Sequence, residues 1–197
     1  MASQQLKTLF RVIVLLWAAH LPVMAQEAPD SNKHIKIDTD SYPVPAETPE
    51  MLFYLQRSLD FNSVIYAAHY EEPKVGHRKL DDEEPVDIYW LINDPAGSTK
   101  PLSTVQKLGY GVKPEDFEGD LVKIHLVAYR DMPIVLKPSP KDAKYHAHIS
   151  VEGKDIILKK VFINIDGGTK LKPNITFIEL TGTNAQNGNK VVHRFKP

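Results

Sequence analysis

The chain has 197 residues, enough for one domain with an extension, and an ordinary composition of 42% hydrophobic and 25% charged residues. This apolar content excludes collagen-like, low-complexity and wholly disordered classes, because a core can be filled. The absence of Cys excludes a disulfide scaffold, a thiolate nucleophile and an iron–sulfur site. With 24 basic and 25 acidic residues, the chain lacks the positive charge of a nucleic-acid binder, so no nucleic-acid partner is expected.

Residues 1–25 have the pattern of a secretory signal peptide. Lys7 and Arg11 give a basic start, and the apolar run Val12–Leu21 follows. This run is shorter than the ~20 residues that a membrane-spanning helix needs, so no transmembrane segment is expected in the mature chain. We expect cleavage after Ala25 and export through the Sec route, which would make the protein periplasmic or secreted. An uncleaved N-terminal anchor or a buried helix is the alternative interpretation.

Residues 26–50 contain four prolines among polar residues and few large apolar side chains. Such a segment cannot bury enough surface to offset the entropy lost on ordering. The sequence therefore predicts a flexible Pro-rich leader over residues 26–50 and a single β domain over residues 51–197.

From Met51 onward, apolar and polar residues alternate with the period of a half-buried strand. In one such segment Val86, Ile88 and Trp90 share a face. The pattern predicts strands over these ranges: Met51–Ser58, Asn62–Tyr70, Val86–Ile92, Leu121–Ala128, Met132–Leu136, Tyr145–Val151, Asp155–Ile163, Asn174–Thr181 and Lys190–Phe195.

Residues typical of tight turns separate several of these strands. Glu152-Gly153 and Asn187-Gly188 predict hairpins, and Arg130-Asp131 and Asp60-Phe61 predict further turns. Strands that are linked so closely must run antiparallel.

One segment, residues 101–109, shows helical spacing. Ser103 or Thr104 is suited to cap its start, and Gly109 is suited to end it. The sequence therefore predicts an all-β, mainly antiparallel fold, either a β-sandwich or a small β-barrel, with one short helix.

The chain resembles the family known as domain of unknown function 4833 in the motif Phe53-Tyr54-Leu55-Gln56-Arg57-Ser58, which is followed by Asn62-Ser63-Val64-Ile65-Tyr66. Later segments that fit the family are Pro85-Val86-Asp87-Ile88-Tyr89-Trp90 and the helix end Tyr110-Gly111. The resemblance covers residues 51–195. It implies a compact β domain, often exported, and it carries over no activity, cofactor or ligand.

The segment around Gln56 and Arg57 is the strongest candidate for a binding site. Strand alternation puts Arg57 on the face opposite Gln56, and a guanidinium binds carboxylate or phosphate through two parallel hydrogen bonds. By residue type and family resemblance, the candidate ligand-binding residues are Gln56, Arg57, Ser58, Asn62, Tyr66, Trp90, Lys107 and Tyr110. The alternative is structural: Arg57 pairs with an internal acid or caps carbonyl groups at the end of the sheet, and Gln56 satisfies backbone groups.

His146 and His148 lie two residues apart, so both side chains project from one face of a strand. This spacing suits two zinc ligands, with His125, His193 or an Asp as a third. The face also carries polar neighbours, so we expect solvent-exposed histidines and predict no metal or cofactor. No G-x-S-x-G nucleophile motif is present, and the acidic run 81–84 lacks the spacing of a calcium loop, so it is expected to be solvated.

These features lead to three hypotheses for function. The first is an exported, non-catalytic binding module for a small or lipid-like amphipathic ligand, or for an envelope partner. The second is a structural or assembly component of the cell envelope, which predicts an exposed apolar patch or a bare strand edge. The third is an unrecognised hydrolase or metalloenzyme, which would need basic and histidine side chains to converge in a cleft. The oligomeric state is left open.

Overall fold

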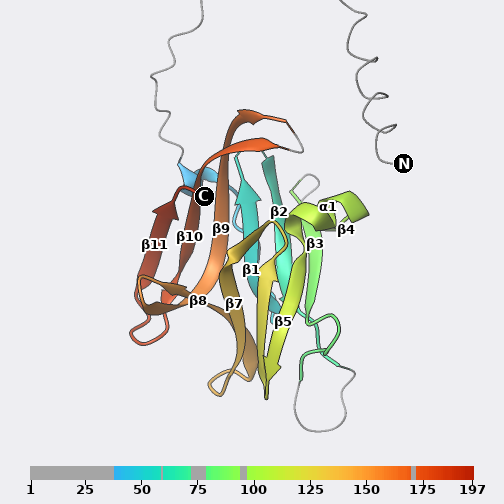
Figure 1. Cartoon of the computed structure of the whole chain (residues 1–197), viewed down its shortest axis with the longest axis vertical. Coiled ribbons are helices and arrows are strands. Elements are labelled where there is room, and N and C mark those ends of the chain that lie inside the picture. The colour runs from blue at the N-terminus through green and yellow to red at the C-terminus, as the bar shows by residue number, and fades with distance from the viewer. Residues whose placement is uncertain (1–37, 59, 72–78, 94–96, 170–171) are drawn as a thin grey trace, which may run out of the picture. The chain divides into compact units, whose positions relative to one another are not determined.

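The structure is a computed structural model that describes residues 38–58, 60–71, 79–93, 97–169 and 172–197. Figure 1 shows a mostly β domain with one short helix. In chain order its elements are the 3-10 helix η1 (Thr39–Ser41), β1 (Met51–Arg57), β2 (Asp60–Ala68), β3 (Val86–Ile92), β4 (Ser98–Pro101), α1 (Thr104–Tyr110), β5 (Val112–Glu118), β6 (Leu121–Leu126), β7 (Tyr129–Ser139), β8 (Lys144–Val151), β9 (Lys154–Gly168), β10 (Pro173–Asn184) and β11 (Lys190–Phe195).

All these strands belong to one sheet, which is organised around the long strand β9. Along one edge of β9 runs β10, antiparallel, with β11 beyond it. Along the other edge, β8 pairs with residues 154–157 and β1 pairs with residues 160–163. β1 and β8 therefore follow one another along the same edge of β9. Each begins an antiparallel meander, β1-β2-β3-β4 on one side and β8-β7-β6-β5 on the other.

The sheet curls into a half-barrel (Figure 1). The two meanders share one apolar core inside it. Because both meanders start from the same edge of β9, each can bury its apolar face against the other. Side chains of this core include Phe53, Leu55, Tyr66 and Trp90 from the first meander and Ile124, Ile134, Leu136 and Ala147 from the second.

A bulge in β9 changes which residues face the core. Leu158 pairs with Gly182, but Lys160 pairs with Thr181, so residue 159 is extra in the ladder. Glycine is required at position 182, because a Cβ there would collide with the carbonyl oxygen of Ile157. Beyond the bulge, Val161 faces the core, whereas Lys160 faces outward.

The predicted fold class is confirmed in its coarse form, since the domain is mostly β with a single short helix in the described residues. The sheet is mainly antiparallel but mixed, because β1 pairs with β9 in parallel. Each predicted strand overlaps an observed one. Neither β4 nor β5 was predicted: both are edge strands with almost entirely exposed residues, so neither carries an alternating apolar pattern.

Two predicted turns and the predicted helix end are displaced. Arg130-Asp131 lies within β7, and the β6–β7 connection is a turn at residues 127–128. Asp60-Phe61 begins β2 rather than preceding it. The helix has the expected Ser103 cap but ends at Tyr110, where Gly111 N donates to the Lys107 carbonyl oxygen.

Residues 38–50 differ from the predicted flexible leader. Residues 38–48, here called the strap, pack on the outer face of the sheet. The Thr39 hydroxyl donates to Glu179 at 2.8 Å, and the Thr39 carbonyl oxygen accepts from Lys160 at 2.7 Å. The Tyr42 ring lies edge-on to Phe162 at 4.9 Å between centroids. These partners are more than 100 positions away in sequence, so composition alone did not reveal them.

The predicted signal peptide and residues 26–37 lie outside the described residues. Within the described part of the chain, none of the helical segments is long and apolar enough to cross a membrane.

Candidate functional site

The eight predicted site residues fall into two groups. Arg57, Tyr66, Trp90 and Tyr110 come together on the inner face of the half-barrel, at one end of the core. Gln56, Ser58, Asn62 and Lys107 do not join them. The alternation expected along β1 explains the split between Arg57 and Gln56, because neighbouring residues of a strand point to opposite faces.

Arg57 is half-exposed and held from two sides. Its Nε and one terminal nitrogen donate to the same Asp60 carboxylate oxygen, at 3.1 and 2.8 Å. The guanidinium carbon lies 5.9 Å from the centre of the Trp90 ring. Burial raises the pKa of the Tyr110 hydroxyl, and the nearby Arg57 charge opposes this shift only in part. The pairing with Asp60 is the structural role that the sequence offered as an alternative.

Tyr66 and Trp90 form the buried base of this group. The Tyr66 hydroxyl donates to the Tyr110 carbonyl oxygen at 2.8 Å, which ties the end of α1 to the core, and its ring stacks on Phe53 at 4.3 Å. Trp90 meets Tyr110 edge-on at 5.4 Å. The indole N–H of Trp90 is buried and has no acceptor among the described residues. These contacts pack Tyr66, Trp90 and Tyr110 together beside Arg57.

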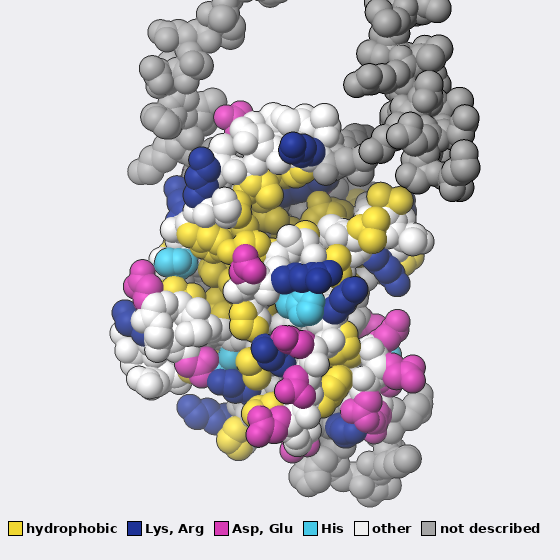
Figure 2. Space-filling model, in the orientation of Figure 1, with side chains coloured by type: hydrophobic (Ala, Val, Ile, Leu, Met, Phe, Trp, Pro, Cys, Tyr) yellow, Lys and Arg dark blue, Asp and Glu magenta, His cyan; other side chains and the backbone are white. Residues whose placement is uncertain are grey.

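Arg57 stands at one end of an apolar row that crosses the inner face. Strand register pairs Arg57 with Ile163, Ile163 with Ile178, and Ile178 with Phe195, across β1, β9, β10 and β11. We call these four residues the mouth row. Tyr129 of β7 lies 5.9 Å from Phe195 between ring centroids. In Figure 2, hydrophobic side chains gather in the upper half of the face in view, between the β9–β10 hairpin and α1.

The remaining predicted residues have structural partners or lie apart. Ser58 Oγ donates to the Ile165 carbonyl oxygen and accepts from the Ile165 N–H, which fixes the end of β1 on β9. Asn62 Oδ1 accepts from the Asn93 N–H. Lys107 is exposed on α1. Gln56 is fully buried on the outer face and bonds to the strap.

Sequence reasoning missed a cleft of about 420 Å³ between the strap and the outer face of the first meander. The residues that line this strap cleft are Pro43, Val44, Pro45, Ala46, Thr48, Met51, Phe61, Ser63, Ile65, Tyr89, Leu91, Ile92, Asn93, Gly97 and Thr99. None of the predicted site residues is among them. A signal was present in the sequence: residues 64–68 are continuously apolar, which indicates a strand covered on both faces.

The histidines of β8 bond to carboxylates. His146 Nε2 lies 3.0 Å from Asp142, and His148 Nδ1 lies 2.8 Å from Asp155, which also accepts from Lys137 at 2.9 Å. Burial lowers the pKa of His148, although the hydrogen bond to Asp155 opposes that shift. Across the described ranges, no three His, Asp or Glu side chains gather in a way that could hold a metal ion.

Fold and geometry together define a mostly β domain with a curled half-barrel sheet, an arginine at the end of an apolar inner row, and a cleft under the strap. The chain belongs to the family described as domain of unknown function (DUF4833), whose family model matches residues 53–194. The resemblance carried by the motif at residues 53–58 is thereby confirmed. No curated protein and no solved structure matches the chain.

Proposed function

We propose that this protein is a non-catalytic binding module for an amphipathic ligand that carries an anionic group, and that the ligand lies along the mouth row. The observation that carries the proposal is the register of Arg57, Ile163, Ile178 and Phe195 on one face of four adjoining strands. A carboxylate or phosphate would bind at Arg57, and the apolar part of the ligand would extend toward Phe195.

Arg57 has donors to spare for such a ligand. A guanidinium has five N–H donors in a planar fork, and the Asp60 oxygen engages two of its nitrogens. Asp60 therefore fixes the plane of the guanidinium and leaves other donors for an anion. The Arg57 side chain is 39% exposed, so it is accessible from solvent.

The apolar part of the row supplies the rest of the affinity. Ile163 and Phe195 are only partly buried against the core. Covering such side chains with an alkyl chain is favourable by about 25 cal/mol for each Å² of apolar surface removed from water. A ligand with both an anion and an alkyl chain thus contacts Arg57 and the apolar residues of the row. A simple salt would contact only Arg57, and a hydrocarbon would contact only the apolar residues.

The proposal includes export. We propose that residues 1–25 are removed and that the mature chain starts at Gln26, in the periplasm or outside the cell. The support is the sequence pattern of the N-terminal residues. The intact mass of the protein from its own host tests this, and an uncleaved chain would contradict it.

A structural role in the cell envelope is a second candidate. It is favoured by Val105 and Leu108, which are 64% and 69% exposed on α1. Residues three apart on a helix share a face, so these two form an apolar surface. Exchanging both for Ser would abolish co-purification of an envelope partner if this role holds.

The binding proposal is tested with dodecanoate and its uncharged counterpart dodecanol. Arg57→Gln should weaken dodecanoate binding by about tenfold or more, because a hydrogen bond to a charged group contributes roughly 1.5–3 kcal/mol. Dodecanol binding should change little. Asp60→Asn should strengthen dodecanoate binding, because a competing carboxylate is removed.

Lys190→Gln is the matched control, since it removes an exposed charge from β11 and should alter neither affinity. Calorimetry of both ligands on all four proteins provides the readout. Equal losses for dodecanoate and dodecanol in Arg57→Gln would contradict the proposal, as would failure of the wild-type protein to bind dodecanoate.

A further inference from the structure

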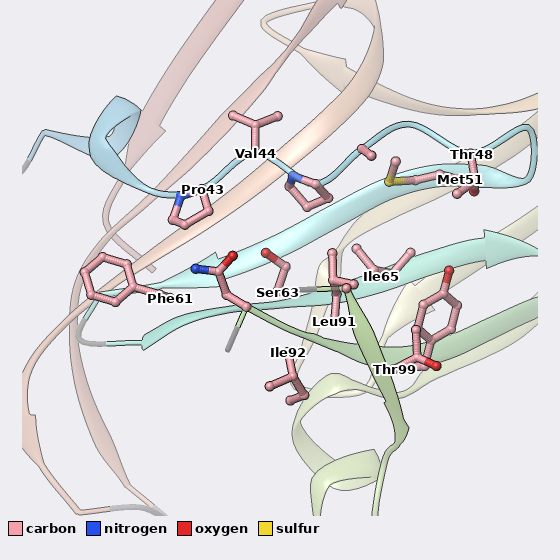
Figure 3. A pocket seen from close by; sticks show the side chains of 15 residues that line it. Pro43, Val44, Thr48, Met51, Phe61, Ser63, Ile65, Leu91, Ile92 and Thr99 are labelled. Atoms are coloured by element: carbon pink, nitrogen blue, oxygen red, sulfur yellow. The ribbon is translucent and has the colours of Figure 1, made fainter. Parts of the chain in front are cut away.

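The strap cleft lies on the opposite face of the first meander from the mouth row. Figure 3 shows Pro43 and Val44 on the strap, with Ser63 and Leu91 on the strands beneath it. Phe61 stands at one end, and Thr48 and Met51 stand toward the other. The cleft is therefore bounded by a strap on one side and a sheet on the other.

The lining of the cleft carries no charged side chain in the described residues. Most of it is aliphatic or aromatic, and its polar side chains are the neutral ones of Thr48, Ser63, Tyr89, Asn93 and Thr99. Its volume of about 420 Å³ falls within the roughly 300–1,000 Å³ typical of small-molecule sites. A charged ligand would lose its hydration there without gaining an ionic partner. The lining therefore selects for an uncharged molecule.

Ser63 supplies an oriented polar contact inside the cleft. Its Oγ accepts from Gln56 Nε2 at 3.0 Å, and the same Gln56 nitrogen donates to the Pro43 carbonyl oxygen at 2.6 Å. Because the Pro43 carbonyl oxygen can only accept, these two bonds determine the orientation of the Gln56 side-chain amide. Because Ser63 Oγ already accepts from Gln56, its own O–H is left to donate to a ligand.

Gln56 adds a second observation. The residue is fully buried, and its Oε1 has no donor among the described residues. Buried polar atoms nearly always have a hydrogen-bond partner. Gln56 Oε1 is therefore an acceptor behind the strap that the described residues leave without a donor. Val44 and Phe61, 72% and 62% exposed, add apolar surface beside the cleft. The cleft is therefore flanked by exposed apolar surface at Val44 and Phe61.

We propose that the strap cleft is a second ligand site, which binds an uncharged and mainly apolar small molecule. The molecule carries an acceptor to which the Ser63 hydroxyl donates a hydrogen bond. The site is independent of the mouth row, since it lies on the other face of β1 and β2 and shares no residue with it.

Fluorescent dyes of matched shape test the charge preference. Phenylnaphthylamine is uncharged and apolar, whereas anilinonaphthalene sulfonate has similar rings and a negative charge. The wild-type protein should bind phenylnaphthylamine in a saturable way. Thr99→Trp and Leu91→Trp place a large ring in the cleft, and each should weaken this binding by about tenfold or more, a change of ~1.4 kcal/mol.

Val192→Trp is the matched control, because it adds the same ring at an exposed position of β11 and should leave phenylnaphthylamine binding unchanged. Thr99 is exposed, so Thr99→Trp should keep the wild-type urea midpoint even if Leu91→Trp destabilises the fold. Arg57→Gln should also leave this binding unchanged, which separates the cleft from the mouth row.

Prodan, an uncharged dye with a ketone, tests the role of Ser63. Ser63→Ala should weaken prodan binding several-fold and leave phenylnaphthylamine, which has no ketone, unaffected. Three outcomes would overturn the proposal: no saturable binding of phenylnaphthylamine, wild-type affinity in Thr99→Trp, or equal loss of both neutral dyes in Arg57→Gln. A preference for the sulfonated dye that depends on cleft residues would do so as well.

Discussion

Gln56 and Arg57 are neighbours in β1, yet they reach two different environments. Gln56 points to the outer face, where the strap covers it completely and its amide bonds to the Pro43 carbonyl oxygen. Arg57 points to the inner face, where it remains half-exposed beside Asp60. The Gln56 amide nitrogen therefore bonds within the protein, whereas the half-exposed Arg57 can also bond to solvent or to a ligand.

The same contrast separates the two proposed sites. The mouth row ends in a cation and exposes part of Ile163 and of Phe195, so it suits an anionic amphiphile. The strap cleft has an uncharged lining, so it suits a neutral molecule. One sheet thus offers two chemically distinct surfaces because a short N-terminal segment covers part of its outer face.

The largest expected effect concerns the aromatic cluster beneath the strap. Phe162 is fully buried there, between Tyr42 and Phe177. Phe162→Ala should lower the free energy of unfolding by about 3–5 kcal/mol, the usual cost of removing a buried aromatic ring. If the outer face were only a surface covered by a loose leader, the loss would be far smaller. Urea denaturation of the chain measures the difference.

Val192→Ala serves as the control for Phe162→Ala. Val192 is 53% exposed on β11, so its truncation should change stability by less than about 0.5 kcal/mol. Equal losses in the two variants would contradict a second buried cluster on the outer face.

The next effect concerns the attachment of the strap at Glu179. This carboxylate is buried, accepts from the Thr39 hydroxyl at 2.8 Å, and accepts from Arg194 at 2.6 and 3.1 Å. Glu179→Ala removes the acceptor of the Thr39 hydroxyl and of Arg194. We expect a loss of about 1–3 kcal/mol, because Arg194 is half-exposed and can bond to water instead.

Hydrogen exchange distinguishes this role from general destabilisation. In Glu179→Ala, amides of residues 38–48 should exchange faster than those of β6 and β7 when each is compared with the wild-type protein. Glu152→Ala is the control, because that side chain is 72% exposed and its contact with His193, at 3.8 Å, is longer than a hydrogen bond. Unchanged exchange of the strap in Glu179→Ala would show that other contacts hold it.

Local signals in the sequence were sufficient for much of the sheet. Alternation identified the strands of the core, Glu152-Gly153 marked a hairpin with positive φ at both residues, and Ser103 marked the helix start. Each of these features depends on residues close in sequence. The coarse fold and the placement of Gln56 and Arg57 on opposite faces of their strand could therefore be predicted.

What could not be predicted depends on contacts distant in sequence. The strap is fixed by Thr39 to Glu179, a separation of 140 residues, and no pattern in residues 38–48 announces that partner. The mouth row likewise exists only because β9 pairs with β1 in parallel. The bulge in β9 also moves Lys160 and Phe162 to the outer face, which simple alternation does not reveal. Contacts between residues distant in sequence, rather than residue type, bring together the residues of both proposed sites.

The smallest expected effect is a pH dependence at His148, on the second meander. Burial lowers the pKa of this imidazole below its ordinary value of 6.5, and the bond to Asp155 opposes the shift without reversing it. The unfolded chain then binds more protons than the folded chain between the folded pKa and 6.5. Stability should therefore rise with pH across that window and fall as the pH drops through it.

An NMR titration of the His148 ring, with urea midpoints measured across the same pH range, checks this sign. Asp155→Asn removes the partner that favours the charged imidazole, so the pKa of His148 should fall further in this variant. Val191→Ala, on the strand β11, should leave the titration unchanged. A midpoint for His148 above 6.5 would mean that Asp155 outweighs burial, and the stability of the protein would then decline as the pH rises through this range.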